Sequence, residues 1–350
     1  MRISSISRTM APIVNARHLF KSSPTGYPVP GETTVHDTSA VIDLENEPLH
    51  GGFLAKTLVL SIDPYMRGRM KVNAATGKSG FAVGEPLVNF GVAKILRSEN
   101  PALKIRAEPH RSAFAEYFVS RNASAFEVID SGSGIPSSAY VGVLGMPGKT
   151  AYYGWNEFAK AKKGEKVFVT TGAGPVGSFV VQLAKREGLR VIASAGSDEK
   201  VEFLRKIGVD VAFNYKTQST AEVLQREYPI DIYWDNVGGE TLDIALANAN
   251  GNGTARFISE PYALKNVYLI LSKEISMFGF WVGRHEAKYG AEFRRVVPQF
   301  VKGGDIQYLE DKSYGLETAG QGILDVLQGM FFCMCVGMAC ICTRVYHQSS

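Results

Sequence analysis

The chain has 350 residues, of which 45% are hydrophobic and 21% are charged. This length and composition suit a globular protein of two domains rather than one. Its 38 basic and 34 acidic side chains leave a net charge of only +4, an excess too small to predict nucleic-acid binding. All four cysteines lie at or after residue 333. The preceding chain therefore has neither a disulfide framework nor a thiolate zinc site, and we expect a reducing, cytoplasmic location.

The two ends of the chain differ from the rest. Residues 1–9 contain two arginines and three serines but no apolar core. They predict an N-terminal extension and not a secretory signal, while an organelle-targeting interpretation stays open. Residues 330–350 form a cysteine-rich tail whose apolar stretch of 13 residues, 330–342, is shorter than the roughly 20 that a membrane-spanning helix needs. We therefore expect no membrane association.

Residues 11–140 are rich in glycine, proline and short β-branched runs. Residues 57–62 and 116–119 predict strands, and turns such as Asp63-Pro64 interrupt the pattern. This half of the chain is therefore predicted to be a β-rich, irregular domain.

From Lys166 onward, predicted strands and helices alternate. The strands are expected at 166–171, 190–195, 211–215, 230–234 and 255–259, and the helices at 176–188, 198–207 and 239–249. Such alternation is typical of a parallel sheet covered by helices on both faces. A further helix and a return segment are expected between residues 285 and 330.

A glycine-rich turn, Gly172-Ala173-Gly174-Pro175-Val176-Gly177, joins the first of these strands to its helix. We expect Gly172 to allow the tight turn, Gly174 to let the backbone approach a pyrophosphate, and Gly177 to let helix and strand pack closely. The amides at the start of the helix would then face the anion. The alternative is a glycine-rich loop that binds no ligand.

The second strand of this region indicates which dinucleotide binds. It ends Ala195-Gly196-Ser197, where a protein that binds NAD usually carries Asp or Glu. No carboxylate is present to repel a 2′-phosphate, and Ser197 and Lys200 can bind one. NADP is therefore favoured over NAD. The alternative for Lys200 is a solvated lysine on a helix surface, since Glu199 and Glu202 lie nearby.

No metal site is predicted. Zinc catalysis needs Cys, His or carboxylate ligands that converge on an open position, and no two histidines are spaced as a ligand pair. The histidines are His18, His36, His50, His110, His285 and His347. The Cys-x-Cys pairs of the tail leave a soft-metal site open as an alternative.

Six segments occur in one order within residues 11–328. They are LSIDPYMRGRM at 60–70, GMPGKTAY at 145–152, the glycine turn, AGS with Lys200 at 195–200, FNYK at 213–216 and YWDNVGGE at 233–240. Together they resemble the zinc-independent medium-chain dehydrogenases/reductases of the leukotriene dehydrogenase, prostaglandin reductase and alkenal double-bond reductase group, with the fungal-type members most similar.

The resemblance implies an α/β fold: a Rossmann doubly wound parallel sheet plus a GroES-like β-rich domain. Residues 1–9 would be an extension, 10–140 the GroES-like substrate domain, 141–300 the Rossmann NADP-binding domain, 301–329 a return segment to the substrate domain, and 330–350 the atypical tail. The family commonly forms homodimers, which is the expectation for this chain.

The resemblance also implies an activity, the NADPH-dependent reduction of the carbon–carbon double bond of an α,β-unsaturated aldehyde or ketone. Tyr65 would line the substrate pocket, where a neutral phenol can donate a hydrogen bond to a developing enolate. The alternative for Tyr65 is a packed aromatic at a turn. The implied cofactor contacts are Gly174, Pro175 and Val176 beside the pyrophosphate, Lys200 and Tyr215 with Ser197 near the 2′-phosphate, and Asn236 near the nicotinamide.

Three segments depart from the family pattern. Residues 104–111 form a charged stretch with a proline, which we expect cannot replace a central strand. A segment with a tyrosine near the nicotinamide ribose is missing after Phe257-Ile258, and the tail replaces a final strand. Lost strands leave backbone groups unpaired at a cost of about 1–3 kcal/mol for each buried group, so the three departures together could prevent folding.

Two alternatives to an enal or enone reductase stay open at this point. The same scaffold could carry a zinc-free quinone or ketone reductase, because the substrate pocket decides the substrate. The three departures leave a non-catalytic NADP-binding relative as the other alternative.

Overall fold

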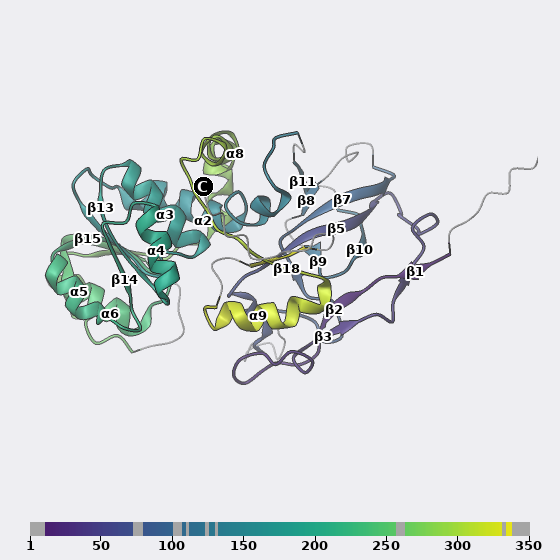
Figure 1. Cartoon of the computed structure of the whole chain (residues 1–350), viewed down its shortest axis with the longest axis horizontal. Helices are drawn as coiled ribbons and strands as arrows, with labels where there is room; N and C mark the ends of the chain where they lie inside the picture. The colour runs from purple at the N-terminus through teal and green to yellow at the C-terminus, as the bar shows by residue number, and fades with distance from the viewer. Residues whose placement is uncertain are drawn as a thin grey trace, which may run out of the picture. The chain divides into compact units, whose positions relative to one another are not determined.

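The computed structural model describes residues 11–72, 80–100, 107–109, 112–122, 126–129, 132–256, 263–330 and 334–337. The chain divides into two compact units, which Figure 1 shows to differ in architecture. Residues 1–141 with 310–350 form a β-rich unit, and residues 142–309 form an α/β unit.

The α/β unit contains a six-stranded sheet. Its strands are β12 (Lys166–Val169), β13 (Arg190–Ala195), β14 (Val211–Asn214), β15 (Ile230–Trp234), β16 (Ala249–Arg256) and β17 (Ser276–Phe278). Their spatial order is β14-β13-β12-β15-β16-β17, and every neighbouring pair is parallel. This is the order of a doubly wound sheet that binds dinucleotides, so the predicted fold class is confirmed.

Helices connect these strands (Figure 1). They are α2 (Met146–Gly154) with a π-helical turn at Trp155–Ala159, α3 (Pro175–Arg186), α4 (Asp198–Lys206), α5 (Thr220–Glu227), α6 (Gly239–Asn248), α7 (Tyr268–Ser272), the 3-10 turn η4 (Val282–His285) and α8 (Glu286–Lys302). Serine residues cap the amino ends of α4 and α5. The hydroxyls of Ser197 and Ser219 accept hydrogen bonds from the backbone amides of Lys200 and Glu222. Such caps satisfy amides that have no partner within the helix.

Stacked aromatic rings hold the middle of this sheet together. Phe168 of β12 stacks on Phe213 of β14 and on Tyr233 of β15, with ring centroids 6.2 and 5.2 Å apart. All three side chains are buried. Because they come from three strands, their burial fixes how the sheet packs against the helices on that face.

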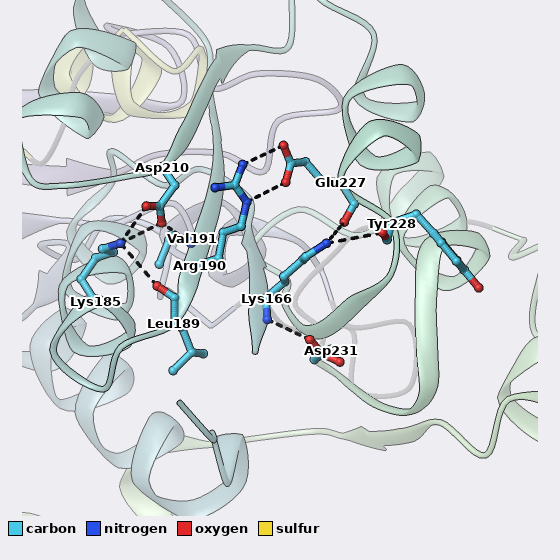
Figure 2. Close-up of polar contacts among 9 residues, drawn as sticks. All are labelled: Lys166, Lys185, Leu189, Arg190, Val191, Asp210, Glu227, Tyr228 and Asp231. Atoms are coloured by element: carbon cyan, nitrogen blue, oxygen red, sulfur yellow. Dashed lines mark hydrogen bonds and ion pairs between the residues drawn. The ribbon is translucent and has the colours of Figure 1, made fainter. Parts of the chain in front are cut away.

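Ion pairs and backbone contacts join the amino ends of the strands (Figure 2). Lys166 Nζ donates to the carbonyl of Glu227 at 2.8 Å, and Arg190 binds the Glu227 carboxylate at 2.8 and 3.0 Å. Lys185 Nζ donates to both carboxylate oxygens of Asp210 at 2.8 and 2.9 Å. The Arg190 guanidinium lowers the pKa of Glu227. Polar side chains thus connect the strands at their amino ends, while the glycine turn lies at the carboxyl end of β12.

The β-rich unit is built around β5 (Phe53–Ile62), a ten-residue strand that pairs with β7, β10 and β19. The main sheet runs β11-β8-β7-β5-β19-β18, with β10 also on β5. Its other members are β7 (Gly91–Ser98), β8 (Ala107–Pro109), β10 (Tyr117–Ser120), β11 (Phe126–Val128), β18 (Asp311–Tyr314) and β19 (Met334–Gly337).

Shorter elements complete this unit. Two-stranded pairs form between β1 (Ile13–Val14) and β4 (Val41–Ile42), β2 (Arg17–Phe20) and β3 (Thr34–Asp37), and β6 (Val88–Asn89) and β9 (Ser112–Ala113). The helical elements are α1 (Met66–Met70), the 3-10 turns η2 (Ser137–Val141) and η5 (Leu316–Thr318), and α9 (Ala319–Leu327). Met66 and Met70 of α1 share one buried cluster with Leu60 and with Ile323 of α9.

Two of the three sequence departures contain strands, so the expectation that those strands are lost was wrong. Residues 107–109 form β8, which lies between β7 and β11, and residues 334–337 form β19, which lies between β5 and β18. β8 is only three residues long and Pro109 is its last residue, where a missing amide removes least from the ladder. Residues 104–106, 110–111, 257–262 and most of the tail lie outside the described residues.

Most other predicted elements agree with the structure to within a few residues. The exception is β16, which begins at Ala249 rather than at residue 255. The Asn-Gly-Asn-Gly run from residue 250 is unfavourable for continuing a helix, and β15 provides a parallel neighbour for it.

Candidate functional site

The glycine turn begins after β12 and ends inside α3. A Cβ atom on Gly177 would lie 2.4 Å from the carbonyl oxygen of Thr171, and one on Gly172 would lie 2.7 Å from the Cβ of Ala193. Both positions therefore need glycine because of close packing. The residue with a positive φ in this turn is Thr171, at 50°. Gly172 lies within this turn, and the absence of its side chain also lets the turn pack against Ala193 of β13.

The start of α3 offers backbone amides to an anion. Gly174 precedes the helix in an extended conformation, Pro175 is its first residue, and the first turn contains no acidic side chain. The first amides of a helix have no intrahelical partner and carry the positive end of the helix dipole. Proline at the first position removes one amide that would be unpaired anyway, so the next amides are those of Val176 and Gly177.

A second cluster of polar residues lies at the carboxyl ends of β13 and β14. A Cβ atom on Gly196 would lie 3.0 Å from the Tyr215 hydroxyl, so that hydroxyl lies directly over the glycine. Ser197 begins α4, and its hydroxyl accepts from the amide of Lys200 at 3.4 Å. The Tyr215 side chain is 52% exposed. The Tyr215 hydroxyl and Ser197 therefore lie beside a position that carries no side chain, and Lys200 follows in the first turn of α4.

One carboxylate near this group is held by a neighbour. Asp198 lies in the first turn of α4, and its Oδ1 accepts from Asn214 Nδ2 at 2.8 Å. Asn214 is buried at the end of β14. The hydrogen bond fixes Asp198 against the end of β14.

Asn236 lies just beyond β15, and its side chain and backbone amide form hydrogen bonds to neighbouring residues. Its Nδ2 donates to the carbonyl of Thr170 at 2.7 Å, its backbone amide donates to Thr170 Oγ1 at 2.8 Å, and its Oδ1 accepts from Trp234 Nε1 at 3.1 Å. Asn236 therefore joins the carboxyl ends of β12 and β15. Its side chain defines the edge of the sheet beside the glycine turn.

Asp235 is a residue of this edge that the sequence analysis did not single out. It is 2% exposed, and its Oδ1 accepts from the Tyr233 hydroxyl at 2.9 Å and from the amides of Val237 and Gly238 at 2.8 and 2.6 Å. Its Oδ2 has no hydrogen-bond partner among the described residues. Burial raises the pKa of Asp235. A carboxylate at the end of an apolar strand, Ile230–Trp234, was the available sequence signal.

Tyr65 belongs to the β-rich unit, in the turn between β5 and α1. Its ring is 41% exposed, and its hydroxyl donates to Asn89 Oδ1. Asn89 Nδ2 donates in turn to Asp63 Oδ2 at 2.9 Å and to the carbonyl of Ser61 at 3.0 Å. Asn89 and Asp63 are both buried. The sequence analysis identified Tyr65 but not Asn89, which lies 24 residues away with no local signal to connect the two.

Comparison with known proteins identifies the family. The family described as "Zinc-binding dehydrogenase" matches residues 175–301, and the one described as "N-terminal domain of oxidoreductase" matches residues 17–128. The 2-alkenal reductase (NADP(+)-dependent) of Nicotiana tabacum is 36% identical over 331 residues, which cover 91% of this chain and 95% of that protein. The chain belongs to the zinc-independent medium-chain dehydrogenase/reductase family.

Further relatives and structures agree with this family. The (+)-pulegone reductase of Mentha piperita is 38% identical over 296 residues, covering 80% of this chain and 85% of that enzyme. The crystal structure of CurA from Vibrio vulnificus in complex with NADPH superposes with a TM-score of 0.82 at 28% identity, covering 93% and 100% of the two chains. The chain is therefore an oxidoreductase with the two-part fold of its family.

The reductase contains no cluster of three or more His, Cys, Asp or Glu side chains that could hold a metal ion within the parts of the chain that the structure describes. The cysteine pairs of the tail and His347 fall outside those parts, apart from the backbone of Cys335 in β19. None of the described helices combines the length and the hydropathy needed to cross a bilayer.

Proposed function

We propose that this chain uses NADPH to reduce the carbon–carbon double bond of α,β-unsaturated aldehydes or ketones, without zinc. The observation that carries the proposal is the pair of anion-binding positions at the carboxyl ends of β12 and β13. One is the start of α3 with its glycine turn, and the other is Gly196, with the Tyr215 hydroxyl beside it and Ser197 and Lys200 at the start of α4. Relatives named as NADP-dependent 2-alkenal reductase and pulegone reductase support the substrate class.

The residues at these two positions fit the phosphates of NADP(H), which is the cofactor. The backbone at Gly172, Gly174 and Gly177 leaves room for the pyrophosphate, beside Pro175 and the amide of Val176. Ser197, Lys200 and Tyr215 would bind the 2′-phosphate, because a dianion favours a cation and hydroxyl donors. NADPH, when bound, supplies the hydride. Asn236 would hold the sheet edge where the nicotinamide approaches.

Tyr65 would act on the substrate carbonyl. A phenol keeps its proton at neutral pH and can donate it in a hydrogen bond. As negative charge develops on the carbonyl oxygen, that hydrogen bond strengthens and lowers the barrier. Its exposed ring and its position after β5 support this role for Tyr65, and no metal ion is required to polarise the carbonyl.

The proposal includes the arrangement and the location of the protein. The boundaries expected from the sequence were 10–140 and 301–329 for the substrate domain and 141–300 for the NADP-binding domain. The structure divides at 141/142 and 309/310 instead, and we propose these roles for its β-rich and α/β units. A homodimer is supported by β17, which ends the parallel sheet, and by Leu271 and Trp281 near it, which are 86% and 72% exposed. A cytoplasmic location is supported by the absence of cysteine before residue 333.

Oxidation of NADPH tests the function directly. The purified protein is mixed with NADPH and a 2-alkenal, a quinone, a saturated ketone or no acceptor, and the products are analysed. We expect consumption of NADPH with the 2-alkenal and formation of the saturated aldehyde. Oxidation only with the quinone or the ketone would replace the proposed substrate class.

Thermal unfolding with and without NADPH distinguishes an inactive protein from one that does not bind. A ligand at a hundred times its dissociation constant stabilises the folded state by about 2.7 kcal/mol. A rise in melting temperature without turnover would indicate a non-catalytic NADP-binding protein. No rise and no turnover would contradict the proposal altogether.

A further inference from the structure

Asn214 is the last residue of β14, and its side-chain amide has one fixed orientation. Its Oδ1 accepts from the backbone amide of Lys216 at 3.1 Å, and its Nδ2 donates to Asp198 Oδ1 at 2.8 Å. The first of these contacts, to an amide two residues further on, forms an Asx turn. A flipped amide would place two donors against each other at Lys216. The nitrogen therefore stays on the side of Asp198.

The backbone of Asn214 is fixed as well. Asn214 lies opposite Ala195 in the parallel pairing of β14 with β13, and its carbonyl accepts from the amides of Thr217 and Gln218 at 3.1 and 2.9 Å. Only 8% of the residue is exposed. A rigid and buried side chain therefore presents its donor to Asp198.

Asp198, in contrast, is an exposed carboxylate at the first position of α4. Within the described part of the chain it forms no ion pair with a basic side chain, and Asn214 supplies the hydrogen bond that holds it. The first amides and the dipole of a helix attract anions. A released Asp198 would therefore turn toward the start of α4, beside Ser197, where the 2′-phosphate is proposed to bind.

We propose that Asn214 is a positioning residue that determines cofactor specificity: it holds the Asp198 carboxylate against the end of β14 and so keeps this charge away from the 2′-phosphate. The inference rests on the proposed function for the place of the 2′-phosphate, beside Gly196, and not for the substrate. Asn214 contacts no atom of the cofactor in this scheme. Its effect should appear with ligands that carry a 2′-phosphate and vanish when Asp198 has lost its carboxylate.

A double-mutant cycle measured by ligand binding tests this role. Dissociation constants for 2′,5′-ADP and 5′-ADP are determined by calorimetry on the full chain as wild type, Asn214→Ser, Asp198→Ala and the double variant. A serine hydroxyl can still accept within the turn, but its side chain is too short to hold Asp198. We expect Asn214→Ser to weaken binding of 2′,5′-ADP about fivefold, the size of an interaction between exposed charges, with little change for 5′-ADP.

The Asp198→Ala background shows whether the carboxylate mediates this effect. In that background Asn214→Ser should change the dissociation constant of 2′,5′-ADP by less than about twofold, because the charge that Asn214 holds is absent. The same loss in both backgrounds would overturn the proposal. Equal losses for the two ligands would also overturn it, since they indicate a purely structural role.

A matched control removes an asparagine elsewhere in the same unit. Asn248 Nδ2 donates to the carbonyl of Ile244 at 2.9 Å in α6. Asn248→Ser removes this side-chain hydrogen bond without touching β13, β14 or α4. We expect it to leave the ratio of the two dissociation constants unchanged, and a shift equal to that of Asn214→Ser would contradict the proposed specificity of Asn214.

A reciprocal exchange covers the case in which Asn214→Ser does not fold. Asn214→Asp keeps an acceptor for Lys216 but places a second carboxylate against Asp198, so it should weaken 2′,5′-ADP more than 5′-ADP. Asp198→Asn in the Asn214→Asp background restores one donor and one acceptor at the net charge of the wild type. This double variant should recover most of the affinity for 2′,5′-ADP, and the proposal fails if it recovers none.

These measurements need no turnover, so they separate the inference from the proposed reaction. A wild type that binds 2′,5′-ADP no more tightly than 5′-ADP would refute the position of the 2′-phosphate, and this inference with it. A wild type that prefers 2′,5′-ADP, with the same preference in Asn214→Ser, would overturn the inference alone. Failure to reduce a 2-alkenal would refute the proposed reaction but not the role of Asn214.

Discussion

The Tyr215 hydroxyl lies over Gly196 so closely that a Cβ atom on the glycine would be 3.0 Å from the phenol oxygen. The two residues come from the loops after neighbouring parallel strands, β14 and β13. An aromatic hydroxyl is thus brought to the place where many dinucleotide-binding folds carry a carboxylate. The relationship links the fold to the choice of cofactor.

We expect Gly196→Asp to reverse that choice. The new carboxylate would repel the 2′-phosphate and displace Tyr215, so the KM for NADPH should rise by at least tenfold while that for NADH rises little or falls. Initial rates at varied cofactor concentration measure both. Gly279→Asp is the control, because nothing lies within 4 Å of a Cβ at that exposed glycine of the same unit. Equal changes for the two cofactors would contradict the assignment.

Lys200→Ala removes a cation rather than adding an anion. Charge-assisted hydrogen bonds contribute about 1.5–3 kcal/mol, so we expect the KM for NADPH to rise roughly 10- to 100-fold with little change for NADH. Lys206→Ala, in the last turn of the same helix, controls for loss of a lysine from α4. If NADPH and NADH weaken to the same extent, Lys200 does not contact the 2′-phosphate.

The parts of the site that depend on local sequence were predictable. The glycine turn and the end of β13 each combine a strand, a turn and a helix start within a few residues, so spacing alone indicated their place. Asn89 was not predictable, because its partner Tyr65 reaches it through the pairing of distant segments. The structure adds a packing reason for Gly172, because a Cβ atom there would meet Ala193 of β13.

The elements of the fold likewise separate into those that local sequence predicts and those that depend on distant segments. Alternating apolar runs predicted the parallel sheet because each strand there is continuous and buried. β8 and β19 were expected to be absent, because their sequences resemble no strand. Both pair on two sides within the sheet, and a short segment with two neighbours can be a strand in spite of its own weak preference.

Gly177→Ala should weaken both folding and cofactor binding. The added methyl group would lie 2.4 Å from the Thr171 carbonyl and 2.9 Å from the Gly172 Cα, so helix α3 must move away from β12. Overpacking of this kind costs about 1–3 kcal/mol, which urea unfolding without cofactor should detect. Gly174→Ala is the matched control, because its nearest contact is 3.2 Å. Similar stability losses in both variants would contradict the packing role of Gly177.

Acid should destabilise the β-rich unit through His18. This side chain is 2% exposed and its Nε2 lies 2.9 Å from Thr34 Oγ1. Burial, and then the charge of nearby His36, lower the pKa of His18 from 6.5 to about 4. Between these two values the unfolded chain binds a proton that the folded chain does not, so the free energy of unfolding falls as the pH falls from 6.5 to 4.

The size of this effect makes it measurable. At 1.36 kcal/mol for each pKa unit, His18 should account for about 3 kcal/mol of lost stability at pH 4. His18→Gln carries no titrating ring, so its unfolding free energy should fall less over this interval than that of the wild type. His50→Asn, an exchange at an exposed histidine, should follow the wild-type curve. Parallel curves for the wild type and His18→Gln would show that His18 does not titrate with folding. The slope between pH 6.5 and 4 therefore isolates the cost of charging one buried imidazole.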